Sequence, residues 1–144
     1  MKLPKQFNSS SEEETLAFGE RLARELSPGD VVALQGDLGT GKTHMVKGMA
    51  RALGIDETRV QSPTFALINE YEGILPLYHF DCYRMESVQE ALEIGAEEYF
   101  YGSGVCVIEW PERIASILPE HTIWVQLTST GKQMRQFYIK KNGR

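Results

Sequence analysis

Hydrophobic residues recur along the chain with two alternating periods, and this alternation predicts helices interleaved with strands. The first helical pattern follows a capping box made by Ser11 and Glu14, and the Ser-Pro-Gly tripeptide at 27–29 ends it. An apolar run at 31–34 follows, which is typical of a strand buried on both faces. A second helical pattern then places its apolar residues on one face over 45–53. A buried strand between two helices favours a parallel sheet.

The rest of the chain predicts further strands and short helices. The expected strands are 65–71, 74–83, 105–108, 123–128 and 134–140, and the expected helices are 87–95, 96–101 and 111–118. The last two strands flank the segment 129–132, which is typical of a hairpin turn. We therefore expect an α/β three-layer sandwich with a mostly parallel central sheet and a C-terminal antiparallel hairpin. A chain of 144 residues suits one domain, which we place over residues 1–144.

A glycine-rich segment joins the first predicted strand to the second predicted helix. It reads Gly36, Asp37, Leu38, Gly39, Thr40, Gly41, Lys42 and Thr43. This matches the pattern G-x-x-x-x-G-K-[ST], in which backbone N–H groups of the loop and of the helix N-terminus converge on phosphate oxygens. The Lys42 ammonium is expected to reach the β- and γ-phosphates, and the Thr43 hydroxyl to ligate magnesium. The segment predicts a P-loop NTPase-like fold that binds a nucleoside triphosphate with Mg²⁺.

A P-loop also needs a carboxylate near its metal, and two acidic residues end predicted strands. Glu109 follows the buried strand at 105–108, where a P-loop protein usually has an aspartate. Because ligands gather at the carboxyl ends of parallel strands, we expect Glu109 to contact metal-bound water or orient the attacking water. A carboxylate that faces solvent is the alternative. Asp81 is the second candidate, and it shares a strand face with His79, which we interpret as a hydrogen-bonded structural histidine.

Other motifs, present or missing, narrow the kinds of P-loop protein to which this chain could belong. Ser62, Pro63 and Thr64 form a loop where P-loop proteins often sense the γ-phosphate, although this tripeptide alone does not establish a sensor. The chain has neither N-K-x-D nor D-x-x-G, which disfavours a GTPase. No Asp-Glu pair follows an apolar strand, which disfavours an AAA+ motor, and no arginine-rich lid suggests a small-molecule kinase.

Composition and charge set the compartment and the general character of the protein. With 42% hydrophobic and 24% charged residues, the chain is neither fibrous nor disordered. No apolar run approaches the ~20 residues of a membrane span, and the N-terminus lacks the apolar core of a secretory signal. Cys82 and Cys106 have no CxxC spacing, so we expect buried free thiols. These features predict a cytoplasmic protein without a membrane partner.

The charge of the chain is unevenly distributed. The formal net charge is −5, but no Asp or Glu follows Glu120, so the last 24 residues carry +5 and the first 120 carry −10. The body is therefore expected to bind nucleic acid poorly without sequence preference. The basic end, which includes Lys140 and Lys141, either meets a phosphate or acidic partner or protects an edge strand from aggregation.

Four motifs occur together in an order and at a spacing that resemble one family. They are the P-loop at 36–43, Ser-Pro-Thr at 62–64, His-Phe-Asp-Cys-Tyr-Arg at 79–84 and Val-Ile-Glu-Trp-Pro at 107–111, with Gly-Glu-Arg at 19–21. From about Ser10 to Arg135 the chain resembles the TsaE (YjeE) family, the ATPase of bacterial tRNA threonylcarbamoyladenosine (t6A) synthesis. The third and fourth of these motifs in combination are more specific than the P-loop alone.

The resemblance implies roles for particular residues. It implies that ATP is held by 36–43 with Mg²⁺ on Thr43, that Lys42, Asp81 and Glu109 are catalytic, and that both carboxylates belong to the magnesium site. Which carboxylate lies nearer the metal stays open. It further implies that Ser62, Pro63 and Thr64 act as a switch-like loop, and that Trp110 lies near the nucleotide. Ser11 and Glu12, and the hairpin residues Gly131, Lys132 and Arg135, are expected to approach the nucleotide. His44 stands where the family often has a second threonine.

The resemblance also implies partners. It implies binding to the TsaB–TsaD pair, in which TsaD transfers the threonylcarbamoyl group to adenosine 37 of ANN-decoding tRNAs. Hydrolysis by this chain is then expected to reset the assembly between turnovers, with tRNA met only indirectly. Two alternatives remain at this point. One is a nucleotide-gated protein-binding switch with incidental hydrolysis, and the other is a small P-loop phosphotransferase with its own acceptor.

Overall fold

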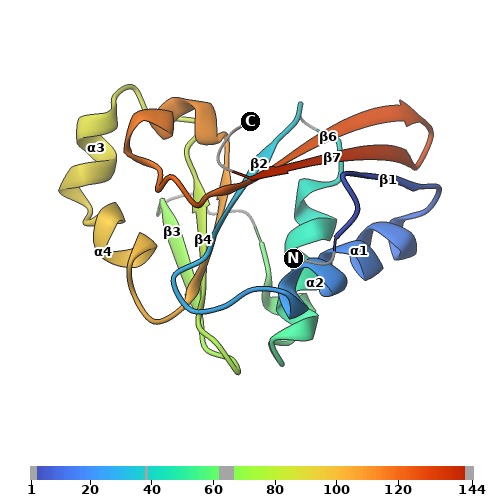
Figure 1. The fold of residues 1–144 in the computed structure, drawn as a ribbon, viewed down its shortest axis with the longest axis horizontal. Coiled ribbons are helices and arrows are strands. Elements are labelled where there is room, and N and C mark those ends of the chain that lie inside the picture. The colour runs from blue at the N-terminus through green and yellow to red at the C-terminus, as the bar shows by residue number, and fades with distance from the viewer. Residues whose placement is uncertain (1–2, 38, 62–66, 142–144) are drawn as a thin grey trace.

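A computed structural model describes residues 3–37, 39–61 and 67–141 (Figure 1). The elements in chain order are β1 (Gln6–Ser9), α1 (Glu12–Arg24), β2 (Val31–Gln35), α2 (Lys42–Ala52), the 3₁₀ helix η1 (Glu57–Arg59), β3 (Ile68–Tyr71), β4 (Leu77–Asp81), α3 (Val88–Glu93), α4 (Ala96–Phe100), β5 (Val105–Glu109), the 3₁₀ helix η2 (Pro111–Ile117), β6 (Ile123–Gly131) and β7 (Met134–Lys141). Strands and helices alternate from β1 to α2, and two consecutive strands and then two short helices follow, as the hydrophobic periods predict for 65–101.

The strands form one seven-stranded sheet in the order β1-β7-β6-β2-β5-β4-β3. The central strands β6, β2, β5 and β4 pair in parallel, whereas β7, β1 and β3 add antiparallel partners at the two sides. The expected α/β fold with a parallel centre and a C-terminal antiparallel hairpin is confirmed. Parallel pairing matters for the site, because it brings the carboxyl ends of β2, β5 and β4 to one edge.

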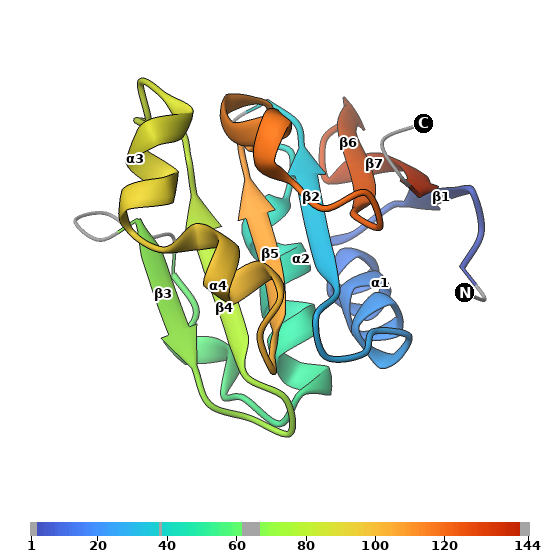
Figure 2. The same cartoon turned by 60° about the vertical axis from the view of Figure 1, so that its left-hand side comes forward.

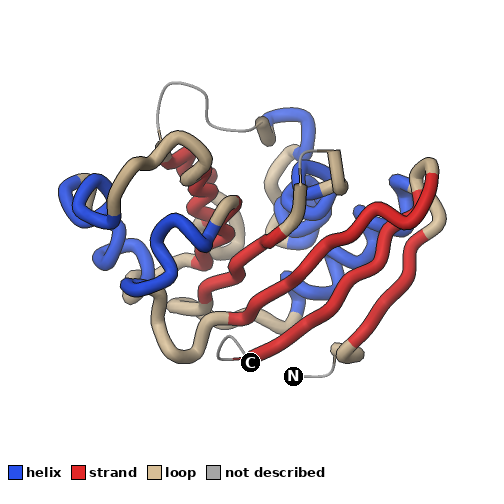
Figure 3. Tube along the Cα trace, turned by 90° about the horizontal axis from the view of Figure 1, so that it is seen from above, coloured by secondary structure: helices blue, strands red, loops and turns tan. Residues whose placement is uncertain are grey.

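Helices cover the two faces of the sheet unequally (Figure 2). On one face, α1 and α2 pack against alternate residues of the central strands, such as Val32 and Val107. On the other face, α3, α4 and η2 pack against Val31, Phe80 and Ile108. The second layer covers β2, β5 and β4 and also contacts Ile68 of β3. Among the described residues, no helix packs on the corresponding face of β6, β7 and β1 (Figure 3).

The two helices of the first layer lie unusually close together. Gly19 of α1 faces the backbone of Met45, and Gly48 of α2 faces the backbone of Leu16. A Cβ atom at either glycine would collide with the carbonyl oxygen opposite it. The pair of glycines therefore sets the distance between α1 and α2, and with it the height of the P-loop above the start of α1.

Some elements differ from the sequence-based expectation. β1 was not predicted, because in Gln6–Ser9 only Phe7 is apolar and no period can be seen in four residues. β1 pairs with β7 only at 135–138, so Lys140 and Lys141 lie beyond this pairing, and their interpretation as edge protection stays a prediction. The helix expected at 111–118 is a 3₁₀ helix with a kink at Ile114. β6 runs on to Gly131 through the expected turn.

The state of the two cysteines agrees with the expectation from the sequence. Cys82 and Cys106 are both buried free thiols, and burial raises the pKa of each to about 12. Such thiols stay protonated at neutral pH, so neither is a nucleophile. Within the described ranges, every helix is too short or too polar to cross a membrane.

Replacing Gly48 by alanine is expected to destabilise the fold, although alanine is the better helix former. The added methyl group has to push α2 away from the Leu16 carbonyl, which costs about 1–3 kcal/mol of the free energy of unfolding. Urea unfolding of Gly48→Ala measures this. The neighbouring Lys47→Ala serves as control and is expected to change stability by less than ~0.5 kcal/mol. A Gly48→Ala protein at least as stable as the parent would contradict the close packing.

Candidate nucleotide site

The candidate site lies where three parallel strands end. β2 ends at Gln35 and leads directly into the glycine-rich loop, while β5 ends at Glu109 and β4 at Asp81. Asp81 pairs with Glu109 in the β4–β5 register, and Leu34 pairs with Glu109 in the β2–β5 register. The two predicted carboxylates are therefore neighbours on adjacent strands, and both lie beside the loop.

The loop turns into α2 at a left-handed residue. Gly41 has φ 97°, a conformation that glycine adopts without strain, and it is the N-cap of α2. It offers no side chain to cap the helix, so the N–H groups of the first turn are left for a ligand. The Thr40 hydroxyl donates to the Asp37 carbonyl at 2.8 Å and holds the loop from within. The loop has the form of an anion cradle.

Lys42, the first residue of α2, keeps its ammonium inside this cradle. The residue is 5% exposed, and Nζ donates to the Gly36 carbonyl at 2.7 Å. Nζ also lies 4.1 Å from the centroid of the Trp110 ring, within the range of a cation–π contact. Burial lowers the pKa of Lys42, and nearby carboxylates oppose that shift, Glu109 most strongly and then Asp81. Within the described part of the chain Lys42 forms no direct ion pair, and a buried cation in this state favours the entry of an anion.

Glu109 is buried too, and its partner is a histidine. The residue is 5% exposed, and its Oε2 lies 2.5 Å from Nε2 of His79, which is fully buried. The interpretation of His79 as a hydrogen-bonded histidine is confirmed, but its partner is the candidate catalytic carboxylate, which sequence reasoning missed. The sequence did contain a signal that His79 belongs to the site. Alternation along β4 places His79 on the same strand face as Asp81, and this face is directed toward α2. The alternative that Glu109 faces solvent is wrong.

These groups surround a cavity of about 530 Å³. Of the residues expected from the sequence, its wall contains Glu12, Gly39, Gly41, Lys42, Thr43, Asp81, Glu109, Trp110 and Arg135. Gly36, Asp37 and Thr40 line an adjoining groove of about 460 Å³ on the other side of the loop. Ser11 caps α1, while Gly131 and Lys132 lie at the hairpin turn, and none of the three lines the cavity. Leu38, Ser62, Pro63 and Thr64 lie outside the described residues.

Arg135 connects the hairpin to the loop. Its Nη2 donates to the Gly39 carbonyl at 3.1 Å, and Nη1 donates to the Met134 carbonyl at 2.8 Å. Its Nε is buried beside Gly41 and has no hydrogen-bond partner among the residues that the structure describes. A buried guanidinium N–H that lacks an acceptor at the wall of an anion cradle is a donor available to an anionic ligand.

Trp110 closes the cavity from the side of β5. It has φ 58° and ψ 49°, a left-handed conformation that is strained for a large side chain. The strained turn directs the indole back over Lys42, and the Tyr83 ring contacts the indole at a tilt of 55°, with ring centroids 4.8 Å apart. Tyr83 is 45% exposed, so this pair of aromatic rings extends from the buried lysine to the surface.

The donor set fits ATP and magnesium. Thr43, Asp81 and Glu109 offer oxygen atoms, the ligands that Mg²⁺ prefers. Among the described residues, no group of three acidic, histidine or cysteine side chains forms a complete metal cage. This suits magnesium, which is usually bound by one or two carboxylates together with substrate phosphates. The open N-terminus of α2, Lys42 and the Nε of Arg135 face the place where those phosphates would lie.

The glycine-rich loop joins a central parallel strand to a helix, and acidic residues lie at the ends of the adjacent strands. This arrangement defines a P-loop nucleoside triphosphatase fold. Comparison with known proteins narrows the class. The family model "Threonylcarbamoyl adenosine biosynthesis protein TsaE" matches residues 9–137, and the chain belongs to the TsaE family.

Individual relatives agree with the family model. The tRNA threonylcarbamoyladenosine biosynthesis protein TsaE of Treponema pallidum is 51% identical over 119 residues, which cover 83% of this chain and 87% of the relative. The protein of that name from Bacillus subtilis is 46% identical over 125 residues, covering 86% and 77%. The crystal structure of YdiB from Bacillus subtilis superposes with a TM-score of 0.79 at 38% identity, covering 96% of this chain and 85% of that one.

Replacing His79 by leucine is expected to cost about 1.5–3 kcal/mol of stability, because the buried Glu109 carboxylate loses its hydrogen-bond partner. Urea unfolding without nucleotide measures the change. His121→Ala is the control. Its Nε2 lies 2.8 Å from the Gly29 carbonyl on the exposed surface, so its loss is expected to cost less than ~1 kcal/mol. Equal stability of the two variants would mean that the buried pair contributes nothing.

Proposed function

We propose that the chain is an ATPase that binds ATP with Mg²⁺ at this cavity and hydrolyses it slowly. The observation that carries the proposal is the buried, incompletely paired Lys42 ammonium beside two aligned strand-end carboxylates. A positive charge held in this way is stabilised by a triphosphate more than by water. We propose that the 144 residues act as one domain.

The residues divide the work as follows. The N–H groups at the start of α2 and the Lys42 ammonium bind the β- and γ-phosphates, and Arg135 reaches the same phosphates from the hairpin. Thr43 and one of the two carboxylates, Asp81 or Glu109, hold magnesium, which neutralises charge on the phosphates. Glu109 orients the attacking water or accepts its proton, and His79 fixes the position of that carboxylate.

We propose that this ATPase serves the synthesis of threonylcarbamoyladenosine in tRNA, as the names of its relatives state for them. In this proposal it works in the cytoplasm with the TsaB–TsaD pair, and hydrolysis resets that assembly between turnovers. The contact between the Tyr83 and Trp110 rings supports a partner-dependent site, since it links the buried lysine to an exposed surface. The alternative is a nucleotide-gated binding module in which hydrolysis is incidental.

Lys42→Ala is expected to weaken ATP binding at least about tenfold. A charge-assisted hydrogen bond to phosphate is worth ~1.5–3 kcal/mol, and the variant lacks it. Isothermal titration with Mg-ATP measures the change. Lys47→Ala, one turn further along α2, is the matched control and is expected to bind as the parent does. Parental affinity in Lys42→Ala would remove the proposed role of the ammonium.

Glu109→Gln is expected to keep ATP binding within about threefold and to lower the hydrolysis rate by about 10²-fold or more, because the amide is no base. The Gln side chain fills the same space and still hydrogen-bonds to His79. Phosphate release is measured with and without purified TsaB–TsaD. The proposal expects stimulation of the parent and none of the variant. Pathway turnover that survives in Glu109→Gln would favour the binding module, and transfer of phosphate to a small acceptor would indicate a phosphotransferase.

A further inference from the structure

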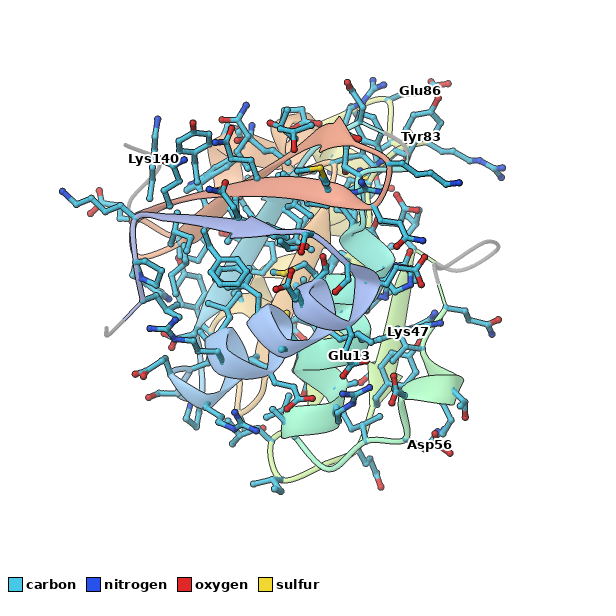
Figure 4. All side chains as sticks on the ribbon, turned by 90° about the vertical axis from the view of Figure 1, so that its right-hand side faces the viewer. Glu13, Lys47, Asp56, Tyr83, Glu86 and Lys140 are labelled. Carbon is cyan, nitrogen blue, oxygen red and sulfur yellow. The ribbon has the colours of Figure 1, made fainter. Side chains whose placement is uncertain are left out.

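The open face of β6 and β7 carries a second hollow, which shares no lining residue with the P-loop cavity, although Gln35 directly precedes the P-loop and Gln126 also lines the groove beside it. Side chains of these strands alternate, so Val125, Leu127 and Phe137 enter the core under α1 while their neighbours point to the uncovered side. The hollow measures about 240 Å³ and is lined by Gln35, Trp124, Gln126, Tyr138 and Lys140. Figure 4 shows Lys140 and Tyr83, a wall residue of the nucleotide cavity, at opposite ends of the β6–β7 ribbon.

The strand register holds these five side chains side by side. Trp124 pairs with Lys140, and Gln126 pairs with Tyr138 on one side and with Gln35 on the other. The two aromatic residues are therefore diagonal neighbours on one face, within reach of a shared planar ligand. Because the positions are set by a sheet and not by loops, the hollow is built into the fold.

The chemistry of the lining is selective. It has two aromatic rings, two amides and one ammonium, and no carboxylate, in a chain that contains 20 acidic residues. The surrounding segment shares this character, since no Asp or Glu follows Glu120. The nearest acidic side chain that contacts the lining is Glu112, which accepts a hydrogen bond from Gln35 at 3.4 Å on the P-loop side. The free end, at Lys140, is positive.

We propose that this hollow binds one unstacked base of a single-stranded RNA. Trp124 and Tyr138 stack on the base, the amides of Gln35 and Gln126 bond its edge, and Lys140 meets the adjoining phosphate. The volume lies below the ~300 Å³ at which pockets for whole small molecules begin, which suits one ring system. A base inside a duplex cannot enter, because its faces are already stacked.

A protein partner fits this face less well. The core of a protein–protein interface is apolar, whereas the residues flanking the hollow on the same face are the amides Gln6, Asn8 and Gln136. Amides together with aromatic rings and a lysine suit base edges, base faces and phosphate, respectively. RNA is preferred to DNA because the proposed pathway acts on tRNA, and in that choice the inference rests on the proposed function.

The test uses the tryptophans as reporters. The chain has two, so in Trp110→Phe the emission of Trp124 is observed alone. A short single-stranded RNA of mixed sequence is expected to quench it and to bind with falling affinity as salt rises. In the parent chain, measured by fluorescence anisotropy of labelled RNA, Trp124→Leu and Tyr138→Leu are each expected to bind about tenfold more weakly, and Lys140→Gln about threefold. The controls Tyr101→Leu and Lys47→Gln remove an aromatic ring and a charge elsewhere and are expected to bind as the parent does.

Several results would overturn the inference. They are no quenching by RNA at ~100 μM, equal binding of a duplex, equal quenching by AMP alone, or hollow variants that bind RNA like the parent. Loss of TsaB–TsaD binding in the hollow variants, without RNA binding by the parent, would mark the face as a protein interface instead. ATP titration of the same proteins separates this failure from failure of the proposed function, because the hollow variants keep the P-loop intact. Equal binding of single-stranded DNA would remove only the preference for RNA.

Discussion

One buried positive charge organises the site. The Lys42 ammonium is removed from water by the chain turn that starts α2, and among the described residues its close partners are a carbonyl oxygen and the face of an indole ring. Neither partner carries a full negative charge. The positive charge of Lys42 is therefore balanced by the carboxylates at the ends of β4 and β5, which act on it without direct contact. The parallel pairing of β2, β5 and β4, the strained turn at Trp110 and the buried His79–Glu109 pair all serve to hold those groups around it.

The two sides of the sheet differ in how helices cover them and in which surface they form. Around β2, β5 and β4, helices cover both faces, and these three strands end near the nucleotide cavity. In the antiparallel half, α1 covers one face and the other is left to polar and aromatic side chains. Gln35 and Gln126 lie on the boundary, where β2 meets β6. The same seven strands thus present a phosphate site at one edge and a separate open surface.

The sequence predicts features that depend on local order and misses those that depend on register. The P-loop motif, the buried runs of β2 and β5 and the capping box at Ser11 can be read directly, because each is specified within a few residues. The contact of His79 with Glu109 joins positions 30 residues apart, and it exists only because β4 and β5 pair in one particular alignment. β1 escaped prediction because its pairing with β7, not its own pattern, makes it a strand. The reach of Arg135 to Gly39 depends on a hairpin that folds back over the loop.

The hydrogen bonds of Arg135 connect the P-loop to the C-terminal hairpin. Its guanidinium grips the carbonyl of Gly39 in the loop and, with its other amino group, carbonyls at the tip of the hairpin. The Arg135 guanidinium therefore connects the loop to the hairpin. A guanidinium can exchange one hydrogen-bond acceptor for another, and its charge stays the same. A ligand oxygen that took the place of the Gly39 carbonyl would remove the tie to the loop and leave the contacts to the hairpin intact. The hairpin consists of two paired strands, and its only fastening to the loop among the described hydrogen bonds lies at the wall of the cavity.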